Sequence, residues 1–230
     1  MTAVVNQLIE LLPARDRRRF LAICEPAELV LAEVLCTPGE STRHAYFPTE
    51  GFISLLTLTG GSPELEVGMV GCEGMLGAQM VLGVATTPLR AIVQGTGTAW
   101  RVEAGAFRKE LERSAALQRV LNRYLYVLMA QLTTSAACLR FHQIGPRLAR
   151  WLLMSQDRAQ SDSFRVTHEF LAYMLGVRRV GITLAANALQ QGGLIAYQRG
   201  DLQVLDRRGL EAAACGCYAA DRKAYTDALC

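Results

Sequence analysis

The stretch that decides the fold is Arg165–Leu205, RVTHEFLAYMLGVRRVGITLAANALQQGGLIAYQRGDLQVL. Thr167 is a good N-cap residue, and the apolar residues after it recur at helical spacing. Gly176 is expected to end this first helix, because glycine adopts the left-handed backbone at little cost. The pattern then predicts a second helix over about 178–191, which ends at Gly192–Gly193.

A two-stranded hairpin is expected directly after these helices. Residues 194–198 and 202–205 favour strands, and Arg199–Gly200–Asp201 between them is a tight-turn sequence. Asp206 can cap a last helix that begins near Arg207. Two short helices, a tight turn and a hairpin are the layout of a winged helix-turn-helix, whose second helix enters the DNA major groove. The inward positions of that helix are predicted to be Val180 or Gly181, Leu184, Ala185 and Leu189.

The same helix–glycine–helix pattern also occurs in the cores of all-helical proteins that bind no DNA. Three observations favour DNA. The hairpin follows at once, and Arg178 and Arg179 open the second helix, where they can reach phosphates or base edges. Positive charge also gathers in this half: residues 139–230 hold 12 basic against 8 acidic residues, whereas residues 1–138 hold 12 against 13.

Length and composition limit the number of domains and the class of protein. The 230 residues, 51% of them hydrophobic, can form one large domain or two modest ones. No run approaches the roughly 20 apolar residues that cross a bilayer, and the N-terminus lacks the basic-then-apolar order of a signal peptide. We therefore expect a cytoplasmic protein with no membrane partner. Seven cysteines, an odd number, argue against a disulfide framework.

The N-terminal half predicts an antiparallel sandwich or barrel-like roll. Two short helices, over residues 4–12 and 14–23, precede it and are separated by Pro13. From about Ala27 to Arg101, short β-favouring runs alternate with turn formers such as Gly60–Gly61 and Pro63. One short helix is expected over 75–82. The predicted strands contain Leu29–Leu31, Tyr46–Phe47, Phe52–Leu56, Leu65–Val67, Ala91–Val93 and Trp100–Val102.

A long helix is predicted over about 115–139, because apolar residues recur there at steps of three and four. They form two stripes, too many for one buried face. We expect one stripe to pack on the helix's own domain and the other on a second copy of the chain. The alternative is a central core helix of a monomer. The residues expected to form the dimer contact are Leu117, Leu121, Tyr124, Leu128 and Gln131. A shorter helix over 147–158 and a polar link over 159–163 then lead to the helix-turn-helix.

The order of these elements, together with the local sequence, resembles the Crp/Fnr superfamily of bacterial transcription regulators. The stretch LAYMLGVRR, residues 171–179, followed by Ala188–Leu189 and Gly193–Leu194–Ile195, is similar to the family's LA-x-x-LG-x-x-R … L-x-x-x-GLI pattern. The stretch RLARWLL, residues 147–153, resembles the R-[LI]-A-x-x-L-L segment ahead of that domain. The likeness covers nearly the whole chain.

This resemblance implies an α+β fold: a cyclic-nucleotide-binding-like antiparallel β-roll over 1–114, a long dimerisation helix over 115–142 and a winged helix-turn-helix over 143–230. It also implies a homodimer that binds a near-palindromic operator in double-stranded DNA, that contacts RNA polymerase and that is not an enzyme. In the DNA-binding half, Arg179 matches the arginine that reads guanine. Val180 and Leu184 stand where many members carry a glutamate and a second arginine, so a different half-site is expected. The residues expected at DNA are Thr167, His168, Arg178, Arg179, Thr183, Asn187 and Arg199.

The sensor half departs further from the family pattern. Members that bind cyclic nucleotides use a Gly-Glu pair for the ribose and an Arg-Ser/Thr-Ala unit for the phosphate. Here the nearest match to the first is Gly77–Ala78, and the nearest match to the second is Thr87–Pro88–Leu89 or, with a shift, Leu89–Arg90–Ala91. Alanine cannot hydrogen-bond a sugar, and a buried phosphate needs a cation, so cyclic AMP is not the expected effector. An unknown small-molecule effector would contact Glu73, Gly77, Arg90 and Tyr124.

The cysteines leave a thiol- or metal-based redox sensor open as an alternative. Cys24 and Cys36 are too isolated to hold an iron–sulfur cluster alone. Cys138 and His142 share a helix face if the helix continues, and Cys215, Cys217 and Cys230 form a second candidate set. For each set we expect ordinary buried or surface side chains, and hence no metal and no cofactor. Cys72, in a glycine-rich stretch, is a candidate for thiol oxidation.

The histidines lie far apart in sequence, at positions 44, 142 and 168, and predict no catalytic triad. The chain also has no phosphate-binding loop and no metal-binding helix motif. A dimeric interaction module that does not bind DNA is a further alternative, which the double arginine disfavours.

Overall fold

The computed structural model describes residues 6–57 and 64–230. Two short helices, α1 (Gln7–Glu10) and α2 (Ala14–Leu21), precede the strands and are separated at Pro13, as predicted. Residues 4 and 5 of the first expected helix, and the expected turn at Gly60–Gly61 and Pro63, lie outside the described residues. No helix within the described part has both the length and the apolar character needed to cross a membrane.

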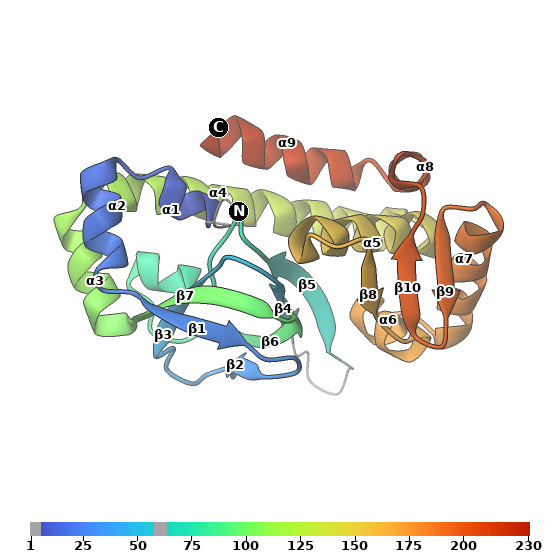
Figure 1. Ribbon diagram of the computed structural model, residues 1–230, viewed down its shortest axis with the longest axis horizontal. Coiled ribbons are helices and arrows are strands. Elements are labelled where there is room, and N and C mark those ends of the chain that lie inside the picture. Colours follow the sequence, from blue (N-terminus) through green and yellow to red (C-terminus); the bar gives the residue numbers. More distant parts are fainter. Residues whose placement is uncertain (1–5, 58–63) are drawn as a thin grey trace.

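Seven antiparallel strands form a β-roll (β1–β7) of two sheets (Figure 1). One sheet has the order β1-β7-β3 and the other the order β2-β6-β4-β5. Apolar residues of both sheets, such as Ile53, Val70 and Val93, fill the space between them. The strands are β1 (Glu25–Leu29), β2 (Val34–Cys36), β3 (His44–Pro48), β4 (Phe52–Thr57), β5 (Leu65–Val70), β6 (Leu89–Gly95) and β7 (Gly97–Glu103).

The predicted strand positions hold with one shift. Leu29 ends β1, and Val30 and Leu31 are exposed beyond it, because the chain turns there instead of continuing the strand. The expected helix over 75–82 is shorter, a 3-10 helix η1 (Ala78–Leu82).

A long helix, α4 (Ala115–Phe141), runs the length of the molecule (Figure 1). It contains neither glycine nor proline, and the Ser114 hydroxyl caps its start by accepting a hydrogen bond from the Leu117 N–H at 3.2 Å. The helix α3 (Ala104–Arg113) leads into it from β7. One side of α4 packs on the β-roll, the N-terminal helices and α3, around the fully buried Phe20, Phe47 and Phe107.

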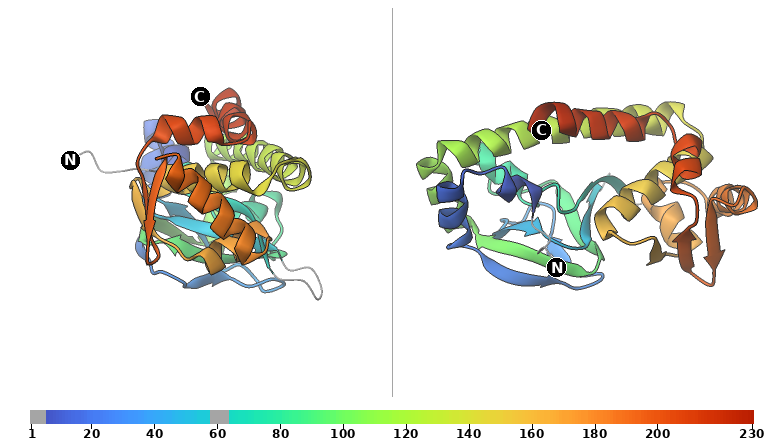
Figure 2. Two further views of the ribbon diagram at one scale, coloured as in Figure 1. Left: turned by 90° about the vertical axis from the view of Figure 1, so that its right-hand side faces the viewer. Right: turned by 45° about the horizontal axis from the view of Figure 1, so that its top comes forward.

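The last helix, α9 (Cys217–Leu229), was not expected from the sequence. It lies antiparallel along α4, and its end packs into the same core through Leu229 (Figures 1 and 2). The predicted third unit, 143–230, therefore contains a helix that lies against the other two. Covering by both the β-roll and α9 explains why α4 carries more apolar residues than one buried face needs.

The helix-turn-helix region (α5–α8) has its own cluster of buried apolar residues at the far end of α4, which Phe52 and Met69 of the β-roll and Tyr218 of α9 join. It begins with α5 (Ile144–Ala159), whose first turn accepts Pro146 because that turn needs no N–H there. It continues with α6 (His168–Leu175) and α7 (Arg179–Gln191) and ends with α8 (Arg207–Ala213). A three-stranded sheet of order β8-β10-β9 completes it. Its strands are β8 (Ser163–Arg165), β9 (Ile195–Gln198) and β10 (Asp201–Val204).

The β-roll and the helix-turn-helix region touch through a few specific contacts. The Trp151 indole N–H on α5 donates to Glu66 Oε1 on β5 at 2.8 Å, and Ser54 on β4 donates to Glu66 Oε2 at 2.5 Å. The Tyr173 hydroxyl on α6 donates to Glu64. Burial raises the pKa of Glu66 to about 7, although both donors and nearby arginines oppose the rise.

Candidate nucleic-acid interface

Local sequence signals build the helix-turn-helix. The Thr167 hydroxyl accepts a hydrogen bond from the Phe170 N–H at 3.1 Å and so caps α6. Gly176 has φ +61°, the left-handed backbone expected at the end of that helix. A side chain there would also meet Leu65 of the β-roll, 2.7 Å from an added Cβ. The Arg147 guanidinium on α5 donates to the Leu175 carbonyl at 2.5 Å, which fixes the turn to the supporting helix.

One face of α7 is buried and the other is exposed. Ile182, Ala185, Ala186 and Leu189 pack into the domain core. The predicted inward positions at Ala185 and Leu189 are therefore confirmed. Of the alternatives Val180 and Gly181, Gly181 faces inward, since a side chain there would meet Ile144, whereas Val180 is 63% exposed. The prediction for Leu184 is wrong, because its side chain is 67% exposed.

The exposed face of α7 presents both cations and apolar groups. Arg178 and Arg179 are exposed at its first turn and form no ion pair with any residue that the structure describes. Val180, Leu184 and Asn187 continue the same face. Exposed apolar side chains beside free guanidinium groups suit a DNA groove, where the thymine methyl offers an apolar contact.

His168 and Thr183 contact each other. The His168 Nδ1 lies 3.1 Å from the Thr183 hydroxyl, and the His168 ring stacks on Tyr197 with a centroid distance of 4.6 Å. The Tyr197 hydroxyl donates to the Val166 carbonyl at 2.6 Å. These contacts join α6, α7 and β9. Burial and the nearby Arg179 charge lower the pKa of His168, which favours the neutral ring.

The predicted hairpin is present as β9 and β10. Its turn residues Arg199 and Gly200 have φ of +52° and +92°, the pattern of a two-residue type I′ turn. Arg199 is exposed at the tip. The third strand, β8, was not predicted as a strand. Its first residue belongs to the predicted polar link over 159–163, and its other residues follow that link. It pairs with β10 in the register Arg165 to Asp201.

The structure corrects the expected dimer contact. Leu117, Leu121 and Tyr124 are buried inside the protomer against the β-roll and the N-terminal helices, so they are not on a surface that a partner can reach. Leu128 and Gln131 are partly covered as well. The apolar side chains that α4 does expose include Tyr126, Met129, Leu132, Leu139 and Phe141.

The four expected effector residues have different surroundings. Gly77 is packed against Ala45 and Met80, and Arg90 forms an ion pair with Glu64 at 3.0 Å. Tyr124 is buried, and its hydroxyl donates to the Met75 carbonyl at 3.5 Å. Glu73 lines a cavity between α5, α9 and the loop after β5.

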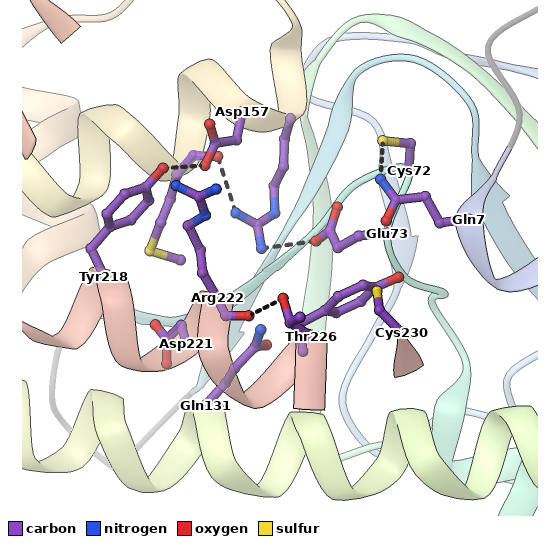
Figure 3. Close-up of a pocket in the computed structure, with 13 residues that line it drawn as sticks. Gln7, Cys72, Glu73, Gln131, Asp157, Tyr218, Asp221, Arg222, Thr226 and Cys230 are labelled. Carbon is purple, nitrogen blue, oxygen red and sulfur yellow. Dashed lines mark hydrogen bonds and ion pairs between the residues drawn. The ribbon is translucent and has the colours of Figure 1, made fainter. Parts of the chain in front are cut away.

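This cavity has a volume of about 350 Å³, and several charged side chains are among the residues that line it (Figure 3). Glu73 forms an ion pair with Arg158 at 2.8 Å, and the Tyr218 hydroxyl donates to Asp157 at 2.7 Å. Gln131, Asp221 and Arg222 complete much of the wall in Figure 3, together with Cys72 and Cys230. Three buried polar atoms beside the cavity have no hydrogen-bond partner in the described structure: Arg158 Nε, Asp221 Oδ1 and the Tyr225 hydroxyl. Sequence reasoning missed this cavity because α9 supplies half of its wall.

Residues 146–213 match the Crp-like helix-turn-helix domain family. The chain carries a Crp-like helix-turn-helix domain. This match confirms the resemblance drawn from LAYMLGVRR and RLARWLL, and the matched residues run from the first turn of α5 to the end of α8. The family and the structural neighbours below are transcription regulators rather than enzymes.

Over most of its length the chain has the fold of Crp/Fnr regulators. A regulator of that family from Eubacterium rectale superposes with a TM-score of 0.69 at 16% identity, over 90% of this chain and 96% of that one. FixK2 from Bradyrhizobium japonicum superposes with a TM-score of 0.70 at 13% identity, over 84% of this chain and 98% of that one. A CRP-family regulator from Thermus thermophilus superposes with a TM-score of 0.67 at 22% identity, over 82% of this chain and 96% of that one. A search of curated proteins by sequence finds no match.

Proposed function

We propose that this protein is a homodimeric, sequence-specific regulator of transcription that inserts α7 into the major groove of double-stranded DNA. The observation that carries the proposal is the two-sided character of α7. One face is locked into the domain core, whereas the other opens with Arg178 and Arg179 and continues with Val180, Leu184 and Asn187. Contact with RNA polymerase follows only from the likeness to the family and is part of the proposal.

The roles of the side chains follow from their positions. Arg179 forms a bidentate contact to guanine O6 and N7, worth about 1–3 kcal/mol of discrimination. Asn187 is one turn or more further along the same face and suits adenine, while Val180 and Leu184 contact thymine methyl groups. Exposed Arg178, the Thr167 end of α6 and Arg199 at the hairpin tip contact phosphates.

His168 and Thr183 act differently in this proposal. Both side chains form hydrogen bonds within the domain. His168 bonds to the Thr183 hydroxyl, and that hydroxyl also donates to the Arg179 carbonyl at 3.1 Å. Their main role is therefore to set the orientation of α7 against α6. A contact from either side chain to DNA is secondary.

A second copy of the chain supplies the partner for α4. Leu125, Met129, Leu132, Ala136 and Leu139 are separated by alternating steps of four and three residues, the heptad spacing of a coiled-coil seam. Met129 and Leu132 are 60% and 48% exposed, and Leu139 is exposed as well. Two α4 helices paired along this seam would place two α7 helices for successive major grooves, about 34 Å apart, on a near-palindromic site.

The cavity in Figure 3 is the proposed place for a small-molecule effector. Charged side chains in its wall come from the β-roll, with Glu73, and from α5 and α9, with Arg158 and Asp221. A ligand there would contact the sensor half and the helix-turn-helix region at once, so its binding energy can favour one arrangement of the two. Of the expected effector residues, this proposal retains Glu73 alone.

The test is selection of binding sites from a random duplex library with the full-length protein, followed by affinity measurements across salt concentrations. We expect a near-palindromic site and affinity that falls as salt rises. Arg179→Ala should lose about 10- to 100-fold affinity for the selected site, with relaxed preference at one base pair. Arg178→Ala should weaken all sequences alike and reduce the salt slope by about 1.

Arg113→Ala is the matched control, because Arg113 is equally charged and exposed but lies at the end of α3 in the sensor half. It should leave affinity and preference unchanged. Unchanged binding by Arg179→Ala would contradict the placement of α7 in the groove. An absence of any salt-sensitive DNA binding would favour the dimeric interaction module instead.

A further inference from the structure

Four side chains with metal-binding atoms meet where the end of α4 lies beside the start of α9. They are Cys138, His142, Cys215 and Cys217, and their sulfur and nitrogen atoms all lie within 4.8 Å of one another. In the sequence these residues belong to two separate candidate metal sets, because 73 positions separate His142 from Cys215. Cys230, which the sequence grouped with Cys215 and Cys217, lies at the opposite end of α9 and lines the cavity of Figure 3.

The distances between these atoms fit the edges of a tetrahedron around zinc. The Sγ atoms of Cys138 and Cys215 are 3.5 Å apart, and the Cys217 Sγ lies 3.5 Å from the His142 Nδ1. With Zn–S of about 2.3 Å and Zn–N of about 2.0–2.1 Å, ideal tetrahedral edges are about 3.8 Å for sulfur to sulfur and about 3.6 Å for sulfur to nitrogen. These two distances are within about 0.3 Å of the ideal edges.

The surroundings also suit a metal site. The three cysteines are buried and form a cluster of their own, separate from the three apolar cores. Three thiolates and one Zn²⁺ leave a net charge of −1, which needs a nearby cation. Arg147 supplies it, because its guanidinium lies close enough to interact with Cys138 and Cys215 and forms no ion pair with any residue that the structure describes. Arg150 is near the same two thiols, but it is already paired with Asp221 at 2.6 Å.

We propose that Cys138, His142, Cys215 and Cys217 bind a zinc ion. Thiolate and imidazole ligands favour zinc over the hard cations magnesium and calcium, which prefer oxygen. Four protein ligands leave no position for water or substrate, so the site is structural rather than catalytic. Binding deprotonates the three thiols, and their protons pass to the buffer. This proposal replaces the expectation of no metal.

The ion would join three segments of the chain. Cys138 and His142 belong to the last turn of α4 and the residue that ends it, and Cys217 is the first residue of α9. The Cys215 N–H donates to the Pro146 carbonyl at 3.4 Å, so the cluster also touches the start of α5. Zinc would fasten α9 to α4 at the point where the long helix passes into the helix-turn-helix region.

The test uses full-length protein, purified without chelators and dialysed, with zinc measured by mass spectrometry. We expect about one zinc per chain. His142→Ala and Cys217→Ser should lose stoichiometric zinc, whereas His142→Cys should retain it, since four cysteines also hold zinc. Cys230→Ser is the matched control, because it removes a thiol from the same helix outside the cluster, and it should keep its zinc.

A second measurement does not depend on how the variants fold. Wild-type protein is stripped with a chelator and titrated with Co²⁺, which should give the intense visible absorption of a tetrahedral thiolate site with saturation near one ion per chain. Reactive thiols should increase by three when zinc is removed. Failure of reduced wild-type protein to take up either Zn²⁺ or Co²⁺ would overturn the proposal. Equal zinc retention by Cys217→Ser and Cys230→Ser would overturn it too.

Discussion

Glu66 lies at the junction between the β-roll and the helix-turn-helix region, and its titration tests how these two parts are joined. Its carboxylate lies between β5 and α5, where Ser54 and Trp151 each donate a hydrogen bond to it. The residue as a whole is only half-buried, but these donors and the surrounding protein enclose both oxygens. Burial raises the pKa of Glu66 from 4.5 to about 7. We therefore expect the stability of the protein to depend on pH through this group.

The direction and size follow from linkage. Below pH 4.5 the carboxyl is protonated in both the folded and the unfolded chain. Between pH 4.5 and 7 the unfolded chain releases the proton while the folded chain keeps it, so the free energy of unfolding falls as pH rises. A pKa shift of one unit corresponds to about 1.4 kcal/mol. The free energy of unfolding is therefore lower above pH 7 than below pH 4.5 by at most about 3 kcal/mol through this group. Water that reaches the small cavity beside Glu66 would reduce it.

Glu66→Gln removes the titration and keeps the shape. We expect Glu66→Gln to become more stable than wild type as pH rises from 4.5 to 8, by up to about 3 kcal/mol. Urea unfolding at a series of pH values, followed by tryptophan fluorescence, measures this difference, and Trp151 lies directly against the altered group. Glu28→Gln, an exposed carboxyl on β1, is the control. A difference between Glu66→Gln and wild type that stays flat with pH would refute the reasoning.

Three further predictions concern the helix cap, the dimer and the core. Thr167→Ala removes the cap of α6 and should lower the free energy of unfolding by about 1 kcal/mol, measured by urea denaturation. Met129→Asp places a charge in the proposed seam and should yield monomers in sedimentation, whereas Arg123→Asp, exposed on α4 outside the seam, should remain dimeric. Phe107→Ala empties part of the aromatic cluster with Phe20 and should cost about 3–5 kcal/mol, seen as a large drop in the urea midpoint.

The parts of the fold that depend on local chemistry were predictable from the sequence. Thr167 caps α6, Gly176 ends it, and Asp206 caps α8 by accepting from the Gly209 N–H at 3.0 Å. The turn at Arg199–Gly200 likewise follows from residues that accept a positive φ. Each of these signals acts within a few residues, so one stretch of sequence contains the whole interaction.

What the sequence did not reveal depends on contacts between distant segments. Apolar spacing showed that α4 is covered on several sides, but not which neighbour covers each side. The stripe through Leu121 and Tyr124 was assigned to a partner, although the protomer's own β-roll and N-terminal helices cover it. The convergence of Cys138 and Cys217 and the cavity beside Glu73 depend instead on α9, which was not expected.

The path of α9 has a mechanical consequence. The helix-turn-helix region is attached to the sensor half by two rigid struts, since α4 leads into it and α9 returns from it to bury Leu229 beside Phe107. A body held by one strut can swing about a single pivot, but a body held by two antiparallel struts moves mainly when one slides past the other. We therefore expect any signal between the two halves to pass as lengthwise displacement of α9 along α4, and reinforcement of that helix pair at either end to stiffen the assembly.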